Sequence, residues 1–391
     1  MRPPLSWLLL VMLGAFSAGA APAPNNLPIR GADVSTLAEL ERLGAHYQDG
    51  IRQGDLLTLM RKRGLNLVRL RLWVDPYSVK GEPFGGGSND RERVIALAQR
   101  SRALNLPWLL DLHYSDFWAD PGKQHTPRAW LGKSDAELEA MLHDYSAAVM
   151  QRLREAGVPP QMVQVGNELN NGMLWPQGRL HRREEAEFDR LAHLLKAAIA
   201  GIRAGSDRGI TPRLMLHLAE GGDEAQCLRW FKAMQARDVP FDLVGLSFYP
   251  YWHGSLDDLS RTMNSLATQI RRQLLVVETA YGHDTVNQDA VRNAFGEREA
   301  VRGGFAATPE GQLAFLAALR AAIAAVPDRL GLGFVYWEPG WIRVPGDSWA
   351  SQAGMAFLGI DEPLGNGWEN QALFDREGRG LPALAAFAQT R

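Results

Sequence analysis

The sequence predicts a single-domain α/β fold, a (β/α)8 barrel. Eight short apolar segments with the composition of strands recur along the chain, and stretches with the apolar spacing of helices lie between them. Such alternation is typical of a parallel sheet with crossover helices, and eight units in 391 residues indicate closure into a barrel. An open doubly wound sheet is the alternative, but no Gly-rich phosphate-binding turn follows the first strand.

The expected strands follow one another at intervals that leave room for a helix. They are PIRGADV (28–34), LVRLRLWV (67–74), PWLLDLHY (107–114), MVQVGNEL (162–169), RLMLHLAE (213–220), LVGLSFYP (243–250), LLVVETAY (274–281) and GLGFVYWEP (331–339). Helical spacing is clear in the stretches that begin at Asp135 and at Pro309. No linker or low-complexity run divides residues 27–391, so we expect one (β/α)8 domain there.

The first residues, MRPPLSWLLLVMLGAFSAGA, join one arginine to an apolar run that closes on small residues. This pattern is typical of a cleavable secretory signal, and the run is too short and wrongly flanked for a good membrane span. We therefore expect residues 1–20 to be a signal peptide and the protein to be exported, to the periplasm or the extracellular medium. An uncleaved anchor is the less favoured alternative.

The composition excludes several classes of protein. Cys227 is the single cysteine, so no intrachain disulfide can form, and the chain is long enough to build its own core. With 42 basic and 44 acidic residues, the net charge of -2 gives no electrostatic reason to expect a nucleic acid or a membrane as partner. We expect a monomer. The 12 tryptophans suggest flat apolar ligand-binding faces as well as core packing.

Reactive side chains stand at the end of nearly every predicted strand. In a barrel the carboxyl ends of the strands meet at one mouth, where active sites form. Packing alone does not explain such a repeated placement. The residues are Asp33, Arg69, Arg71, Asp111, His113, Asn167, Glu168, His217, Tyr249, Glu278, Trp337 and Glu338.

Glu168 and Glu278 each close an otherwise apolar strand, the fourth and the seventh, which face one another across a barrel mouth. Paired carboxylates in a cleft are what glycoside hydrolysis requires, because one assists the leaving oxygen as an acid and the other attacks the anomeric carbon. A pair about 5 to 5.5 Å apart retains the configuration, and a wider pair inverts it. The alternative is that both carboxylates only bridge to barrel arginines.

Asymmetry between the two carboxylates suggests their roles. Asn167 offers an amide to a sugar hydroxyl beside Glu168, and a basic neighbour such as Arg71 is expected to keep Glu278 ionised. We therefore assign Glu168 as general acid/base and Glu278 as nucleophile. Because adjacent residues of a strand point to opposite sides, Asn167 and Glu168 can share a site only if the strand ends or bulges there.

Eight motifs occur along the chain: RGADVS, LRLWVDPY, GGGSND, LLDLHYSDFWADPGKQ, VQVGNELNNGMLWPQG, GLSFYPYWHGSL, VVETAYG and YWEPGWI. Together they resemble one family, the arabinogalactan endo-β-1,4-galactanases of glycoside hydrolase family 53, and the similarity spans about Gly31 to Leu384. The resemblance implies a retaining (β/α)8 glycosidase with its acid/base and nucleophile at Glu168 and Glu278. It also implies a β-1,4-galactan substrate, the type I arabinogalactan side chains of pectin, and no cofactor.

The same motifs suggest sugar-binding residues. Apolar sugar faces stack on aromatic rings, although core packing is the alternative for each tryptophan. Tyr249 is expected to hydrogen-bond the nucleophile, and Asp33 and His217 to position the substrate or the basic groups. The full set expected to bind substrate is Asp33, Arg71, Trp73, His113, Asp116, Trp118, Asn167, His217, Tyr249, Trp252 and Trp337.

The segment 282–308 follows the seventh strand, where some bacterial members of the family hold a structural calcium ion. Asp284, Asn287 and Asp289 are hard oxygen donors, but their spacing matches no strict loop consensus, so we expect a solvated polar loop and no metal. Two other functions stay open: another retaining glycosidase on the same barrel, such as a β-mannanase or β-glucanase, and a non-catalytic carbohydrate-binding protein on a decayed barrel.

Overall fold

The computed structural model describes residues 26–206, 209 and 211–389. The predicted signal peptide, residues 1–20, lies outside this part of the chain. Within the described ranges, no helix has both the length and the apolar character needed to cross a membrane.

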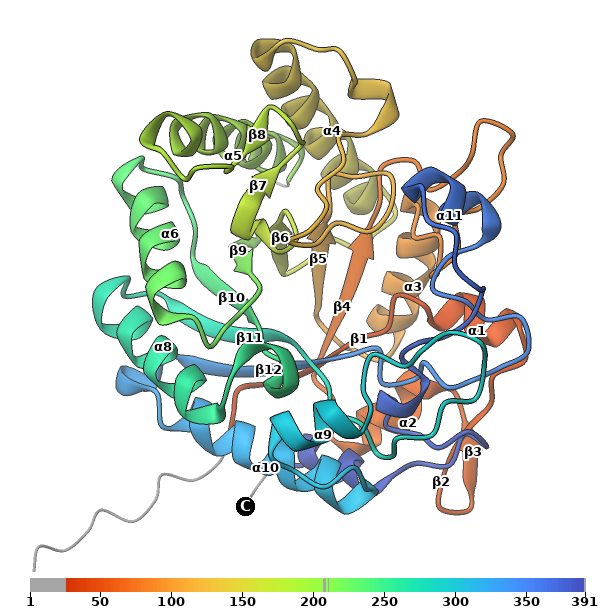
Figure 1. Ribbon diagram of the computed structural model, residues 1–391. Helices are drawn as coiled ribbons and strands as arrows, with labels where there is room; N and C mark the ends of the chain where they lie inside the picture. The colour runs from red at the N-terminus through yellow and green to blue at the C-terminus, as the bar shows by residue number, and fades with distance from the viewer. Residues whose placement is uncertain (1–25, 207–208, 210, 390–391) are drawn as a thin grey trace, which may run out of the picture.

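Eight parallel strands form a closed barrel in the order β1-β12-β11-β10-β9-β6-β5-β4 (Figure 1). This confirms the predicted fold, since seven of the strands fall within their predicted segments and β11 begins one residue before its segment, at Gln273. Two short hairpins lie outside the barrel, β2 (Tyr47–Asp49) with β3 (Arg52–Gly54) and β7 (Gly172–Met173) with β8 (Gly178–Arg179). The barrel strands are β1 (Ile29–Asp33), β4 (Leu67–Leu72), β5 (Trp108–Leu112), β6 (Met162–Val165), β9 (Arg213–Leu218), β10 (Leu243–Ser247), β11 (Gln273–Thr279) and β12 (Gly331–Trp337).

Helices surround the barrel and connect its strands (Figure 1). The α-helices are α1 (Leu37–Arg42), α2 (Leu56–Arg63), α3 (Arg91–Ala103), α4 (Asp135–Glu155), α5 (Glu185–Gly205), α6 (Glu224–Ala236), α7 (Pro250–His253), α8 (Leu256–Gln269), α9 (Glu297–Gly303), α10 (Pro309–Ala324) and α11 (Gln352–Leu358). Single 3-10 turns are found at Arg128–Trp130, Leu169–Asn171, Pro327–Arg329 and Glu369–Gln371, and a longer one at Pro382–Phe387.

Local sequence explains where the long helices begin. The Ser134 hydroxyl accepts a hydrogen bond from the backbone N–H of Glu137, whose side chain returns to the Ser134 backbone, a capping box that starts α4. Thr308 caps α10 and Pro309 occupies its first turn, where the missing proline N–H costs nothing. These caps satisfy backbone donors that have no partner within the helix.

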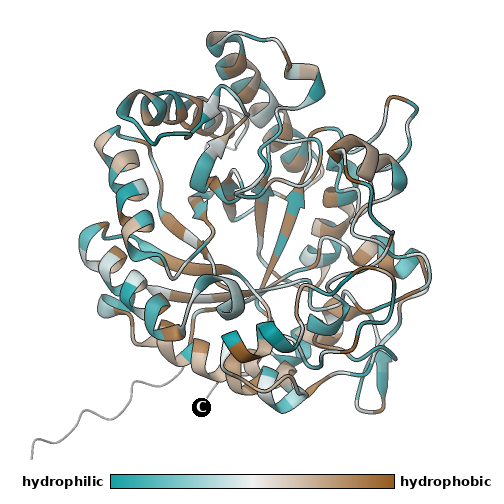
Figure 2. Cartoon of the chain, in the orientation of Figure 1, coloured by the Kyte–Doolittle hydropathy of each residue, from teal (hydrophilic) through white to brown (hydrophobic). Residues whose placement is uncertain are grey.

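Apolar side chains fill both faces of the sheet. Leu109, Leu275 and Val335 belong to a cluster inside the barrel, and the alternate residues of the strands pack outward against the helices. Figure 2 shows the strands as mostly hydrophobic and the helices as mixed, with hydrophilic residues on their outer sides. Because both faces are buried, the strands read as nearly continuous apolar runs, so a polar residue at a strand end stands out.

Candidate active site

A cleft of about 350 Å³ opens at the carboxyl ends of the strands. Nine of the residues proposed from the sequence line it, and the remaining lining comes from loops that follow the strands. The nine are Arg71, His113, Trp118, Asn167, Glu168, Tyr249, Trp252, Glu278 and Trp337.

Glu168 reaches the cleft because β6 ends early. The strand stops at Val165, and the chain then turns through two left-handed residues, Gly166 (φ 85°) and Glu168 (φ 50°). This turn allows Asn167 and Glu168 to share the site, as the sequence required. A left-handed conformation at a residue with a side chain costs about 1 to 3 kcal/mol and is found most often at functional sites.

A bulge in β11 directs the Glu278 side chain, whereas Glu168 is directed by the early end of its strand. Leu275 and Val277 point into the barrel, so strict alternation would turn Glu278 outward. The register of β11 shifts against β10 between Leu246 and Ser247, and it shifts against β12 as well. A bulge re-aims a side chain in this way, and here it brings Glu278 into the cleft.

The two carboxylates meet at the hydroxyl of Ser247. Its Oγ lies 2.7 Å from Oε1 of Glu168 and 3.4 Å from Oε2 of Glu278. These two carboxylate oxygens are therefore at most 6.1 Å apart, the sum of the two distances. Both side chains are largely buried, with 8% of Glu168 and 7% of Glu278 exposed.

Arg69 is the basic partner of Glu278. Its Nη1 lies 2.8 Å from Oε1 of Glu278, and the Tyr249 hydroxyl donates to Oε2 at 3.3 Å. The sequence-based choice of Arg71 was wrong, because Arg71 lies one side-chain layer nearer the mouth and pairs with Glu338 at 2.6 Å. The expected contact between Tyr249 and Glu278 is present.

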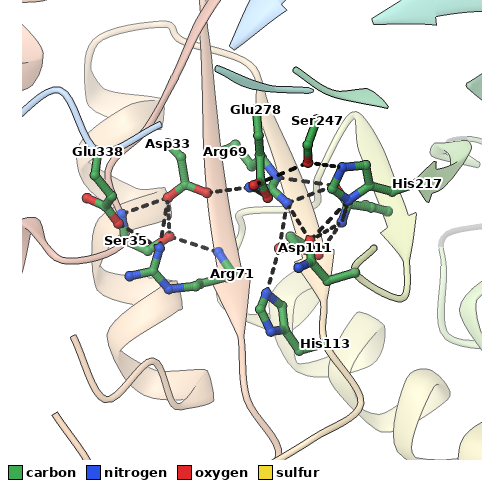
Figure 3. Close-up of polar contacts among 12 residues, drawn as sticks. Asp33, Ser35, Arg69, Arg71, Asp111, His113, His217, Ser247, Glu278 and Glu338 are labelled. Carbon is green, nitrogen blue, oxygen red and sulfur yellow. Dashed lines mark hydrogen bonds and ion pairs between the residues drawn. The ribbon is translucent and has the colours of Figure 1, made fainter. Parts of the chain in front are cut away.

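Arg69 is itself held by two carboxylates, those of Asp33 at 2.9 Å and Asp111 at 2.8 Å (Figure 3). His113 contacts the same Asp111 oxygen at 2.9 Å. The Arg69 side chain is fully buried, so its charge acts with little screening. Asp33 thus positions a basic group, one of the two roles considered for it from the sequence.

The pKa values of the two glutamates are not perturbed alike. Burial, followed by the charge of Glu278, raises the pKa of Glu168 well above its ordinary value. Burial also raises the pKa of Glu278, but the Arg69 guanidinium opposes this effect. The pKa of Glu168 is thus raised further, and only Glu278 has a cation in direct contact with its carboxylate.

Four residues expected to bind substrate are not among those that line the cleft. Trp73 is fully buried and donates from its indole N–H to Nδ1 of His113 at 3.2 Å. Asp116 accepts a hydrogen bond from the backbone of Arg128. His217 and Asp33 are also fully buried. All four are buried and bond to other protein groups.

Three of the six tryptophans that line the cleft were not proposed from the sequence. Trp341, Trp349 and Trp368 come from the long connections after β12, and they join Trp118, Trp252 and Trp337. The ring centroids of Trp337 and Trp368 are 4.6 Å apart. Lys123, Arg292 and Asn366 also line the cleft without having been proposed. The sequence feature that could have indicated these loop tryptophans is the concentration of tryptophan after residue 336.

The polar side chains of the loop after β11 are engaged in hydrogen bonds. Asp284 accepts from the backbone N–H of Val286, and both oxygens of Asp289 accept from backbone N–H groups. Asn287 donates to the carbonyl of Asp289. Among the described residues, no group of three or more His, Cys, Asp or Glu side chains is arranged to hold a metal ion. Asp284 is thus bonded within the loop, and Asp289 also to Asn366 in the connection after β12.

The Arg343 guanidinium is the positive charge beside the acidic residues of this loop. Its Nε lies 3.5 Å from Asp289, its Nη1 pairs with Asp347, and Glu369 is 4.0 Å away. Burial raises the pKa of Glu369 to about 7, and Arg343 partly offsets this. One guanidinium therefore connects the loop after β11 to the connections after β12, and both contribute to the cleft.

We expect Arg343→Ala to lower the free energy of unfolding by about 2 kcal/mol, because it leaves buried carboxylates without a cation. The 28% exposure of the Arg343 side chain keeps the loss below that of a fully buried pair. Urea denaturation measures it, with the exposed Arg302→Ala as control. A chelator should not change the stability of the wild type, and a loss of stability in EDTA would show instead that a bound metal holds this loop.

A (β/α)8 barrel with paired, buried carboxylates in a tryptophan-lined cleft at its carboxyl end is the arrangement of a glycoside hydrolase. Comparison with known proteins agrees. The family model described as glycosyl hydrolase family 53 matches residues 29–387, and the chain belongs to that family.

Relatives and solved structures support this assignment. An endo-beta-1,4-galactanase of Bacillus subtilis (strain 168) is 31% identical over 92% of this chain and 85% of its own. An arabinogalactan endo-beta-1,4-galactanase of Cellvibrio japonicus (strain Ueda107) is 33% identical over 96% of this chain and 94% of its own. The Ignisphaera aggregans GH53 catalytic domain superposes with a TM-score of 0.85 at 36% identity, covering 94% of this chain and 97% of that one.

Proposed function

We propose that this protein is a retaining endo-β-1,4-galactanase in which Glu278 is the nucleophile and Glu168 the general acid/base. The observation that carries the proposal is the bridging of the two carboxylates by one serine hydroxyl. Oε1 of Glu168 and Oε2 of Glu278 are thereby held within 6.1 Å of each other. This supports the close pairing of retaining enzymes, about 5 to 5.5 Å, over the separation of about 6.5 to 9.5 Å with which inverting enzymes accommodate a water. The names of the relatives support galactan as the substrate.

The reaction proceeds in two displacements. The Glu278 carboxylate forms a bond to the anomeric carbon while the bond from that carbon to the glycosidic oxygen breaks, and this oxygen takes the proton of Glu168. Water then attacks the anomeric carbon, gives its proton to Glu168, and releases Glu278 as a carboxylate. Two inversions leave the β configuration unchanged. Arg69 and Tyr249 stabilise the charge on Glu278 before attack and after its release.

The cleft offers several apolar faces to a sugar chain. Trp337 lies between Trp118, with ring centroids 6.1 Å apart, and Trp368. The ring of Trp252 lies next to that of Trp368, and the Trp252 side chain is half exposed. Rings of this kind stack on the apolar faces of successive galactose units, which supports the binding of a polymer within its length.

The ionisation of the two carboxyl groups should set the pH dependence of the activity. We expect a bell-shaped dependence of kcat/KM on pH, with the acid limb set by protonation of Glu278 and the basic limb by loss of the Glu168 proton. Because the charge of Glu278 raises the pKa of Glu168, Glu278→Gln should lower the pKa of Glu168. A 13C NMR titration of the glutamate carboxyls measures it, and an unchanged Glu168 titration would contradict the coupling.

The function is tested by reducing-end release from linear β-1,4-galactan, run beside mannan, xylan and carboxymethyl cellulose. We expect mixed galacto-oligosaccharides from galactan alone, with the β anomer formed first when the products are followed by proton NMR. Activity on another polymer only would keep the two-glutamate mechanism and replace the substrate. Inactivity on all four would favour a carbohydrate-binding protein.

We also propose that the enzyme is exported and acts on the galactan side chains of pectin. The first 20 residues of the sequence support export, and the substrate named for the relatives supports the second part. Mass spectrometry of the mature N-terminus, together with product analysis on pectic galactan, tests both.

A further inference from the structure

Ser247 occupies a central place between the two glutamates. It is fully buried at the end of β10, opposite Glu278 in the shifted register of β11. Its Oγ has three polar neighbours. Oε2 of Glu278 lies at 3.4 Å and Nε2 of His217 at 2.9 Å (Figure 3). Oε1 of Glu168 lies at 2.7 Å. A hydroxyl carries a single proton, so it can donate fully to one of these partners only.

The surroundings of His217 decide the direction of these hydrogen bonds. The backbone N–H of Glu168 points at Nδ1 of His217 from 3.3 Å, and a backbone N–H is always a donor. Nδ1 therefore accepts, although it also lies 3.0 Å from Oδ1 of Asn167, an oxygen that receives a hydrogen bond from Arg69 instead. Burial, followed by the charge of Arg69, lowers the pKa of His217 and keeps the ring neutral. A neutral ring that accepts at Nδ1 carries its proton on Nε2.

The proton on Nε2 of His217 is donated to Ser247, which leaves the serine proton for a carboxylate. Glu168, at 2.7 Å, is much nearer than Glu278, at 3.4 Å. Glu278 already has donors of its own in Arg69 and Tyr249. The chain of donors thus runs from His217 through Ser247 to Oε1 of Glu168.

We propose that Ser247, oriented by His217, is a positioning residue that reserves Oε1 of Glu168 as an acceptor and so places the catalytic proton on Oε2. The proposal rests on the proposed function of Glu168. When the glycosidic oxygen takes the proton from Oε2, Glu168 becomes charged, and the hydrogen bond from Ser247 strengthens as that charge develops. Ser247 therefore assists only the steps in which Glu168 gives or takes a proton.

The proposal is tested by comparing the activity of Ser247→Ala on two substrates. On galactan, whose leaving oxygen needs a proton, kcat should fall by about 10-fold to 100-fold, the usual effect of losing a hydrogen bond to a charged group. On an aryl β-galactobioside with a dinitrophenolate leaving group, which departs without a proton, the glycosylation step measured as kcat/KM should stay within about 2-fold of wild type. Ser247→Thr keeps a hydroxyl and should recover most of the galactan activity.

A titration without substrate makes the test independent of galactan. Loss of the serine donor should raise the pKa of Glu168, because that hydrogen bond favours the charged carboxylate. The 13C NMR titration of Ser247→Ala should show this shift, and the basic limb of its pH profile should move to higher pH. Thr279→Val is the matched control, because it removes from the end of the next strand a buried hydroxyl without a hydrogen-bond partner among the described residues.

The outcomes separate the two claims. If Ser247→Ala loses equal activity on both substrates and the Glu168 titration is unchanged, the positioning role is overturned and Ser247 is a packing residue. A wild-type protein that is inactive on galactan would overturn the proposed function instead, while the titration would still decide whether Ser247 directs its proton to Glu168.

Discussion

Glu278→Ala is expected to lower kcat on galactan by about 10⁴-fold or more, because no carboxylate remains to form the glycosyl-enzyme bond. Azide should restore turnover of an activated aryl β-galactobioside, since the small anion fits the space of the lost carboxylate and attacks from the same side. Direct attack by azide inverts the configuration once, so the product should be the α-galactobiosyl azide. Proton NMR of the isolated product identifies the anomer.

The variant should still fold and bind galacto-oligosaccharides. Glu278 is one of three carboxylates around Arg69, and Asp33 and Asp111 stay in place to hold the guanidinium. Circular dichroism and calorimetric titration with a galacto-oligosaccharide check this. An active Glu278→Ala enzyme, or a β-azide product, would show that another group is the nucleophile.

Glu168→Ala is expected to lower kcat on galactan by about 10²-fold to 10⁴-fold, the usual contribution of general acid catalysis. With the dinitrophenyl galactobioside, the first step needs no proton and should remain fast, so the covalent intermediate should accumulate. A burst of dinitrophenolate followed by slow turnover is the expected trace in stopped flow. Azide should accelerate the slow phase and yield the β-azide, because it attacks the intermediate after one inversion has occurred.

The opposite azide anomers of the two variants make the role assignment testable in one experiment. Glu369→Gln is a suitable control. Within the part of the chain that the structure describes, this buried glutamate does not line the cleft and contacts neither Glu168 nor Arg69. Its activity on both substrates should stay within a few-fold of wild type. Equal damage to both substrates in Glu168→Ala would exclude its role as the acid.

The barrel was predictable because its signal is repeated. Each strand is buried on both faces and therefore reads as an apolar run, so a terminal Glu168 or Glu278 is conspicuous. Barrel geometry then places both ends at one mouth, and the structure brings the two carboxylates to a single serine hydroxyl. The partners of these carboxylates were harder to predict, because Arg69 and Arg71 point the same way from one strand and differ only in depth.

The sequence by itself determined the order of strands and helices, the end of the barrel that carries the reactive groups, and which two carboxylates to pair. These features follow from periodicity and from chain connectivity. Only the tertiary structure decided the bulge that aims Glu278, the choice of Arg69 as its partner, the burial of Trp73 and the loop tryptophans such as Trp368 in the cleft. Such features depend on depth and on contacts between distant, aperiodic segments, which local sequence patterns do not encode.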